Sequence, residues 1–183
     1  MRLPGLTCAF AVVALAAVGA AEKFHGLAIG SYPPGSRVPI TNAELNSYLA
    51  SEVPLLIGPG VRNVRVETES GDIVRGFADI DFLKVRQSYG DNPNRLVSEL
   101  LAGERPVAIT VKVASTAGKC RVDLLSVSVS GLVIEGGTLD FLIRNFVLPN
   151  FPDVKIGKDF ELDFNIDRLE IRPGIAYVVL RGR

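Results

Sequence analysis

Residues 61–82 read VRNVRVETESGDIVRGFADIDF, and this stretch decides the fold class. Apolar and charged side chains alternate with a period of two on both sides of the Ser70-Gly71-Asp72 turn. This period is typical of strands with one buried face, and the turn between the two runs predicts an antiparallel hairpin. The side chains expected on the buried face are Val64, Val66, Thr68, Val74, Gly76, Ala78, Ile80 and Phe82.

Two later segments show the same alternation. The first runs from Val107 through a turn at Ala117-Gly118 and returns to Val129. Its apolar phase slips by one residue at Leu124-Leu125, which predicts a β-bulge and a bent strand. The second alternates over 160–166 and turns at Pro173-Gly174 into a last strand over 175–180. Both segments are therefore predicted to be hairpins.

A helix is expected before the first hairpin. Thr41 and Glu44 have the spacing of a capping box, in which each side chain bonds the backbone N–H of the other residue. The helix is predicted from about Asn42 to Glu52, with Pro54 ending it. Its apolar face consists of Leu45, Tyr48 and Leu49.

Two more helices are expected, over 92–103, where Asn92-Pro93 resembles a helix start, and over 138–147. Helices interleaved with hairpins predict an α+β fold: one curved antiparallel sheet of about six strands or more, with three helices packed on its concave face. We expect one domain over 39–183. A mostly irregular, Gly- and Pro-rich leader over 22–38, with room for one short strand, precedes it.

The N-terminus has the pattern of an export signal. Arg2 precedes an apolar run over 6–18, and the small residues Gly19-Ala20-Ala21 follow it. This order predicts a signal peptide over 1–21, cleaved after Ala20 or Ala21, and hence a periplasmic or secreted protein. The alternative is an uncleaved membrane anchor, but the run is shorter than the roughly 20 residues that span a bilayer.

Composition narrows the possible partners. Twenty basic residues offset twenty acidic ones among 183, so no basic excess exists to neutralise the phosphates of a nucleic acid. Once the signal peptide is removed, Cys120 is the only cysteine left, and no internal disulfide is expected. Stability must then come from a hydrophobic core, which a chain of this length with 48% hydrophobic residues can build.

The sequence contains no clear catalytic or metal-binding pattern. The single histidine, His25, lies in the expected leader without a fixed partner for general base catalysis. Zinc sites need several histidine or cysteine ligands. Carboxylates recur at alternate positions, but opposite apolar side chains, which favours solvated strand faces over a catalytic or calcium-binding pair. They are Asp79 and Asp81, and then Asp159, Glu161 and Asp163. No enzymatic activity, cofactor or metal is therefore expected.

Residues 40–49, ITNAELNSYL, resemble the opening I-T-x-x-E-L-N-x-Y-L of bacterial YceB-like and LmeA-like envelope proteins. The hairpin over 61–82 and the ending LEIRPG at 169–174 fit the same families. These families are similar to the tubular lipid-binding (TULIP-like) fold, whose helices and curved sheet enclose acyl chains. LmeA-like proteins are associated with phospholipid binding. The resemblance implies a lipid-binding envelope protein, although this chain lacks the lipoprotein cysteine that follows the apolar run in YceB-like proteins.

These observations lead to the hypothesis of a non-enzymatic envelope protein that binds or shuttles lipid acyl chains in an apolar cavity, with transient membrane contact. The alternative is an envelope scaffold or assembly factor that binds another protein through a sheet edge. A more distant third class is a hydrolase that uses surface carboxylates. Plain core packing competes with lipid lining for every candidate lining residue. The candidates are Leu45, Leu49, Leu100, Leu139, Leu142, Ile143 and Phe146.

Overall fold

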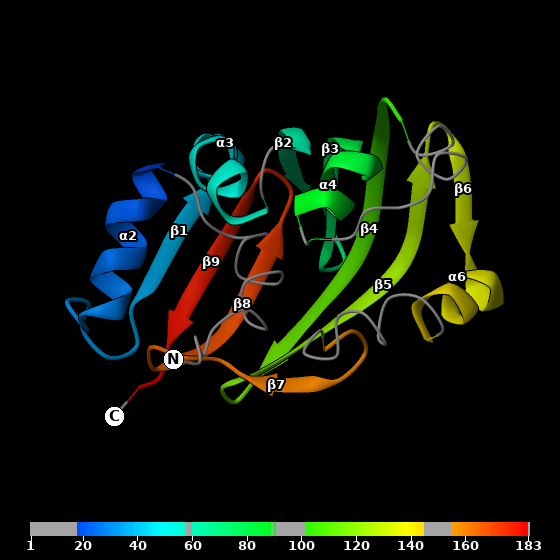
Figure 1. Cartoon of the computed structure of the whole chain (residues 1–183). Coiled ribbons are helices and arrows are strands. Elements are labelled where there is room, and N and C mark those ends of the chain that lie inside the picture. Colours follow the sequence, from blue (N-terminus) through cyan, green and yellow to red (C-terminus); the bar gives the residue numbers. More distant parts are fainter. Residues whose placement is uncertain (1–17, 58–59, 89, 91–101, 145–154, 183) are drawn as a thin grey trace.

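The computed structural model describes residues 18–57, 60–88, 90, 102–144 and 155–182, and Figure 1 shows its helices and strands. The helices in these ranges are α2 (Val18–Ala28), α3 (Asn42–Ile57), α4 (Phe82–Ser88) and α6 (Gly136–Leu142). None of them is long and apolar enough to cross a membrane. The strands are β1 (Arg37–Thr41), β2 (Val61–Thr68), β3 (Ile73–Asp81), β4 (Glu104–Thr116), β5 (Lys119–Val129), β6 (Leu132–Glu135), β7 (Asp159–Glu161), β8 (Ile166–Arg172) and β9 (Ile175–Leu180).

The larger sheet has six strands, in the order β2-β3-β4-β5-β6, with β7 paired to the beginning of β5. All of these pairs are antiparallel. The predicted α+β class and the first two predicted hairpins are therefore confirmed. Strand β6, which joins β5 through a two-residue turn, was not predicted.

The two faces of this sheet differ as the alternation predicts. One face, called the inner face below, carries Val66, Val74 and Val111 and packs on the core. Successive side chains along a strand point to opposite faces, so the residues between these valines lie on the opposite, outer face. Most of them are polar or charged. The side chains of the outer face include Arg65, Glu67, Arg75, Asp79, Thr110, Lys112, Ser126 and Ser128.

Two β-bulges interrupt the ladder. Thr110 pairs with Ser126 and Val111 with Leu124, so Leu125 is the extra residue, as the predicted phase slip requires. The second bulge was not predicted and lies in β2, where the register shifts between Arg62 and Arg65. Within it, Asn63 adopts a left-handed backbone conformation with φ of 52°.

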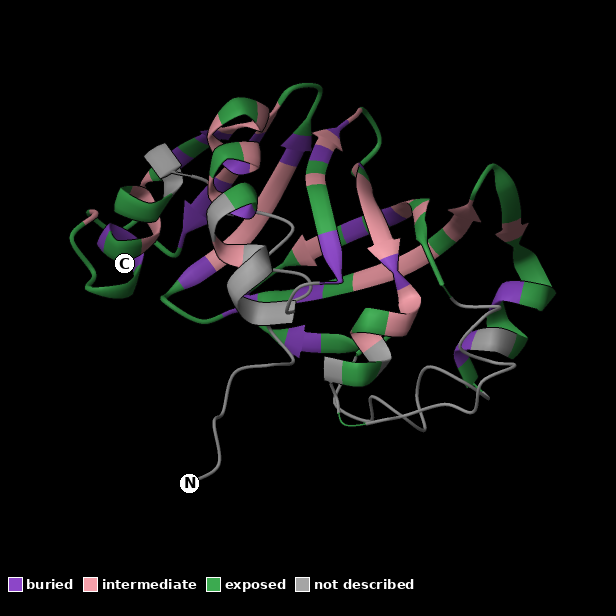
Figure 2. Ribbon diagram, turned by 45° about the horizontal axis from the view of Figure 1, so that its top comes forward, coloured by how far each residue is buried: buried purple, intermediate pink, exposed green. Residues whose placement is uncertain are grey.

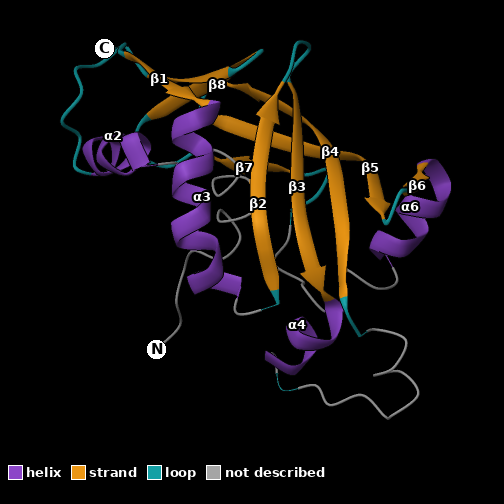
Figure 3. Cartoon of the chain, turned by 90° about the horizontal axis from the view of Figure 1, so that it is seen from above, coloured by secondary structure: helices purple, strands orange, loops and turns teal. Residues whose placement is uncertain are grey.

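A second sheet has three strands in the order β1-β9-β8, whereas the sequence pattern predicted a single sheet. The predicted Pro173-Gly174 turn joins β8 to β9, and β1 pairs with β9 from the other end of the domain. The strands of this sheet run across those of the larger sheet (Figure 3). The core lies among the two sheets, α2 and α3, and includes Ile40, Leu45, Leu49, Val74, Cys120 and Val178.

Helix α3 begins at the predicted capping box. The Thr41 N–H donates to Glu44 Oε2 (2.8 Å), and the Glu44 N–H donates to Thr41 Oγ1 (3.2 Å). The predicted end was wrong, because the helix continues past Pro54 to Ile57. A proline removes one N–H from the helical ladder, here the partner of the Ala50 carbonyl, and this loss kinks or weakens a helix without always ending it.

The predicted irregular leader was also wrong in its first part. Residues 22–28 belong to α2, and the leader ends in β1. Leu27 is only 2% exposed and joins the core, while the Phe24 ring lies 6.3 Å from the Tyr48 ring of α3. Docking on α3 stabilises a short helix that its own sequence supports weakly. The predicted cleavage site after Ala20 or Ala21 falls inside α2, and the predicted signal peptide before Val18 lies outside the described residues. The signal peptide and its cleavage stay predictions.

Three further expectations have different outcomes. The alternating segment 160–166 is not one strand, because β7 ends at Glu161 and both Phe164 and Asn165 have positive φ. Consecutive left-handed residues cannot continue a pleated strand. The helix predicted over 92–103 lies almost wholly outside the described residues. The helix predicted over 138–147 is present as α6 over its first part, and residues 145–147 lie outside the described ranges.

Candidate functional site

The inner face of the larger sheet extends beyond the core. Near α3 and the second sheet its side chains are buried in the core cluster, as at Val66 and Val74. Toward β6 the same face continues with aliphatic side chains that lie outside that cluster and are half-buried or exposed. We call this set the aliphatic patch; it comprises Val107 of β4, Val127 and Val129 of β5, and Leu132 and Ile134 of β6.

The register makes the aliphatic patch continuous. Val107 pairs with Val129 and Val129 with Leu132, while Val127 pairs with Ile134. Cross-strand partners have Cβ atoms about 4.5–5.5 Å apart, so these side chains lie next to one another on one face of the sheet. In Figure 2, β6 is coloured exposed and intermediate along its length. Leu132 is 69% exposed and the other four side chains are half-buried. Large contiguous apolar surfaces are uncommon on monomeric proteins, so the aliphatic patch is the candidate site for an apolar partner.

A basic residue lies at one end of the aliphatic patch. Arg105 pairs with Ile80 of β3 and lies two residues before Val107 on β4, so all three share the inner face. Arg105 is half-buried. A guanidinium stays charged at any physiological pH and can bind a carboxylate or a phosphate. Arg105 already interacts with another group of the chain, so its charge alone does not define a binding site.

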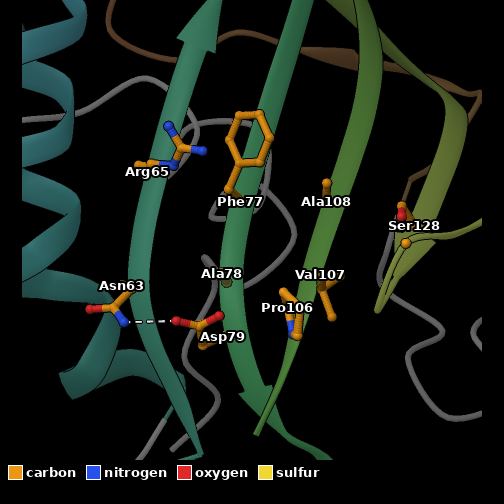
Figure 4. Close-up of a pocket in the computed structure, with 10 residues that line it drawn as sticks. Asn63, Arg65, Phe77, Ala78, Asp79, Pro106, Val107, Ala108 and Ser128 are labelled. Atoms are coloured by element: carbon orange, nitrogen blue, oxygen red, sulfur yellow. Dashed lines mark hydrogen bonds between the residues drawn. The ribbon is translucent and has the colours of Figure 1, made fainter.

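A depression of about 280 Å³ lies on the outer face, and Figure 4 shows the residues that line it. Three of its polar side chains, those of Asn63, Arg65 and Asp79, have partners. The Arg65 guanidinium lies 4.1 Å from the centre of the Phe77 ring and bonds Glu67 at 2.8 Å, and Asn63 Nδ2 donates to Asp79 Oδ2 at 2.7 Å. The charged groups of Arg65 and Asp79 in the wall of this depression therefore already have partners.

The candidate lining residues that the structure describes lie in two separate places. Leu45 and Leu49 of α3 are fully buried in the core beside β2, so core packing accounts for both. Leu139 and Ile143, at α6, are buried at the opposite edge of the sheet, where α6 packs on β5 and β6 (Figure 1). Leu100 and Phe146 lie outside the described residues, as does the side chain of Leu142.

The carboxylates at alternate positions do not make a reactive pair. Asp81, expected on a solvated face, is instead only 7% exposed and caps α4 by accepting the Lys84 N–H (3.1 Å). That backbone hydrogen bond, together with the Lys84 ammonium, lowers the pKa of Asp81. Asp79 bonds Asn63 instead, whereas Asp159, Glu161 and Asp163 are exposed as predicted. Within the described ranges, no group of three or more His, Cys, Asp or Glu side chains could hold a metal ion.

One residue that the sequence reasoning missed joins a helix to a sheet edge. Asn46 of α3 donates from Nδ2 to the Val66 carbonyl (3.1 Å), and its Oδ1 accepts the Val66 N–H (2.6 Å). The side chain therefore satisfies both backbone groups of one residue on edge strand β2. The only signal for it was the asparagine in the I-T-x-x-E-L-N-x-Y-L opening, which gives no indication of a partner.

Comparisons of the chain with family models, with curated proteins and with solved structures found no match. The resemblance to YceB-like and LmeA-like proteins therefore stays a prediction that rests on residues 40–49, 61–82 and 169–174.

Proposed function

We propose that the protein is a non-enzymatic, exported envelope protein that binds the acyl chains of lipids, and that the aliphatic patch is where they lie. The observation that carries the proposal is the continuity of aliphatic side chains on the inner face of β4, β5 and β6 beyond the core. A sheet that needed this face only for its own core would have its apolar residues buried there, as they are at Val66, Val74 and Val111.

The energy available at such a surface is sufficient for a lipid. Each methylene removed from water contributes roughly 0.8 kcal/mol, so about ten methylenes contribute roughly 8 kcal/mol. This matches a Kd of about 1 μM before the entropy lost on association is subtracted. No special polar group is required, and none lies within the aliphatic patch.

The chain has no tryptophan, so a single introduced tryptophan reports on one face of the sheet. Val129→Trp places the indole on the inner face, and Ser128→Trp places it one residue away on the outer face. A fatty acid brominated along its chain quenches indole fluorescence on contact. We expect saturable quenching of the Val129→Trp variant and little quenching of the Ser128→Trp variant.

Equal quenching of both variants, or of neither, contradicts binding at the inner face. Far-UV circular dichroism and the melting temperature of each variant establish that it is folded. A non-brominated fatty acid of the same length is the control. Any fluorescence change that it causes comes from a change in the protein and not from contact of bromine with the indole.

The alternative function, a scaffold that binds protein through a sheet edge, finds support in one observation. Strand β6 is an edge strand with exposed Leu132 and Val133. An edge of this kind can accept another strand. Export to the periplasm or beyond, on which both functions depend, rests on the N-terminal pattern of the sequence.

A further inference from the structure

At three of the sheet edges that the structure describes, side chains form hydrogen bonds with backbone groups of the edge strand. At β2, Asn46 bonds both backbone groups of Val66. At β8, the Ser115 hydroxyl accepts the Leu169 N–H (2.7 Å) and donates to the Leu169 carbonyl (3.0 Å). At β1, the Lys23 ammonium donates to the Pro39 carbonyl (2.7 Å). Exposed backbone on an edge strand invites pairing with another chain, and these contacts prevent it.

The two other described edge strands, β6 and β7, differ in the side chains that they expose. Strand β7 is three residues long and carries the exposed acids Asp159 and Glu161, which also discourage pairing. Strand β6 has aliphatic residues instead: Leu132 is 69% exposed and Val133 58%. Within the part of the chain that the structure describes, no side chain bonds the backbone of β6 from outside, in contrast to β1, β2 and β8.

The turn before β6 determines which of its backbone groups face outward. Ser130 and Gly131 both have positive φ, 51° and 84°, as in a type I′ two-residue turn. In that turn the flanking residues Val129 and Leu132 bond each other, and hydrogen-bonded pairs then alternate along the hairpin. Ile134 therefore also bonds β5, whereas the N–H and C=O of Val133 and the N–H of Glu135 point away from the sheet.

We propose that β6 pairs with β6 of a second copy of this chain, antiparallel about a two-fold axis at Val133. In this register the outward groups of Val133 bond those of the second copy's Val133. Each Leu132 then lies opposite the Ile134 of the other copy on the inner face, so all three central cross-strand pairs are aliphatic. Glu135, the only charged residue of β6, lies opposite a glycine.

Charge selects this register over its neighbours. Moving the axis to Ile134 places each Glu135 opposite a valine, and moving it to Glu135 places two carboxylates opposite each other, which is destabilising. The pairing joins the two inner faces, so the two aliphatic patches become neighbours across the axis. The interface is small compared with the 1,200–2,000 Å² of typical stable complexes, so we expect a Kd on the order of 10 μM.

Sedimentation velocity of the purified protein over a concentration series tests the pairing. We expect a monomer that converts to a dimer across roughly 10 μM. Val133→Lys, which places two ammonium groups opposite each other, and Val133→Pro, which removes the outward N–H without touching the bonds to β5, both remain monomeric to about 1 mM. The matched control is Ser126→Lys, which adds the same charge to the outer face one strand further in and dimerises like the wild type.

Amide hydrogen exchange of the unmodified protein tests the geometry without any variant. The Val133 N–H is expected to exchange more slowly as protein concentration rises through the association range. The Ile134 N–H, already bonded to β5, is expected to be protected at every concentration. A wild type that stays monomeric to about 1 mM overturns the proposal, as does a dimer that survives both Val133 substitutions or leaves Val133 exchange unchanged.

Discussion

The side chain of Asn46 takes the place of a neighbouring strand at the edge of the larger sheet. Both of its bonds go to Val66, which is buried, so removing them leaves an N–H and a carbonyl without partners and out of reach of water. Thr68, two residues further along β2, has a related role. Its buried hydroxyl lies 2.8 Å from the Arg172 carbonyl and 2.9 Å from Asn42 Oδ1, which links β2 to β8 and to the start of α3.

Asn46→Leu is expected to destabilise the protein by about 2–3 kcal/mol, because two buried backbone groups lose their partners. Asn46→Asp retains the acceptor but turns a carboxylate oxygen toward the Val66 carbonyl in place of the donor, so it is also expected to destabilise the protein. Urea unfolding followed by circular dichroism measures both. The neighbouring exposed residue provides the control: Ser47→Ala changes the free energy of unfolding by less than about 0.5 kcal/mol. A neutral Asn46→Leu would contradict the edge role.

Glu44 makes part of the stability dependent on pH. Partial burial acts to raise the pKa of Glu44, but hydrogen bonds from Lys23 and Thr41 outweigh it and lower the pKa below its ordinary value. The folded state therefore keeps this carboxylate ionised at pH values where the unfolded chain takes up a proton. This contribution is fully present above the ordinary glutamate pKa of about 4.3 and is lost as pH falls through the folded value.

Glu44→Gln is accordingly expected to lower the free energy of unfolding by about 0.5–1 kcal/mol at neutral pH. The difference between the variant and the wild type shrinks below a pH of about 4.3 and disappears once Glu44 is protonated in the folded state. Chemical unfolding at a series of pH values measures the difference. A difference that is the same in acid as at neutral pH would show that the charge of Glu44 does not matter.

At the level of elements, the backbone at Gly60 lies very close to α4. The Gly60 carbonyl accepts the Asp81 N–H, and a Cβ at Gly60 would lie 2.6 Å from Val85 Cγ2 and 2.7 Å from the Val85 backbone nitrogen. Only glycine permits this approach without a shift of α4. The contact joins the beginning of β2 to the helix that follows β3.

Gly60→Ala is expected to destabilise the protein by about 1–3 kcal/mol, the usual range for overpacking. Gly137→Ala in α6 has the opposite expectation. Nothing lies within 4 Å of a Cβ there and its φ is not positive, so the alanine stabilises by about 0.4–1 kcal/mol through the unfolded chain. Thermal and urea unfolding of the two variants compare them directly. Equal effects of the two alanines would contradict the close packing at Gly60.

The elements that could be predicted are those whose signal is local. Strands β2 to β5 follow from the period of two, the bulge at Leu125 from the phase slip, and the start of α3 from Thr41 and Glu44. Helix α2 and the continuation of α3 past Pro54 could not be predicted, because tertiary contacts such as Leu27 in the core override weak local preference. Strand β6 is four residues long, too short for a clear alternation.

At the scale of the whole molecule, the second sheet is the main feature that the sequence did not indicate. It requires β1 to pair with β9 from the opposite end of the domain, and no local pattern specifies such a partner. The candidate site, too, depends on tertiary packing that no local sequence pattern specifies. Apolar stripes on helices suggested Leu45 and Leu49, but the structure places both in the core. The aliphatic patch instead comes from strand residues such as Val127 and Val129, whose position relative to the core depends on how the sheets pack.

The larger sheet has an aliphatic inner face that is wider than the core beside it, and the proposed lipid site rests on this excess. Native mass spectrometry of the protein, exported by its host and purified without detergent, tests this claim most directly. We expect the folded protein to carry extra mass that is lost on denaturation and that matches a lipid recovered in an organic extract. The bare mass of the polypeptide, with no lipid in the extract, would contradict the account.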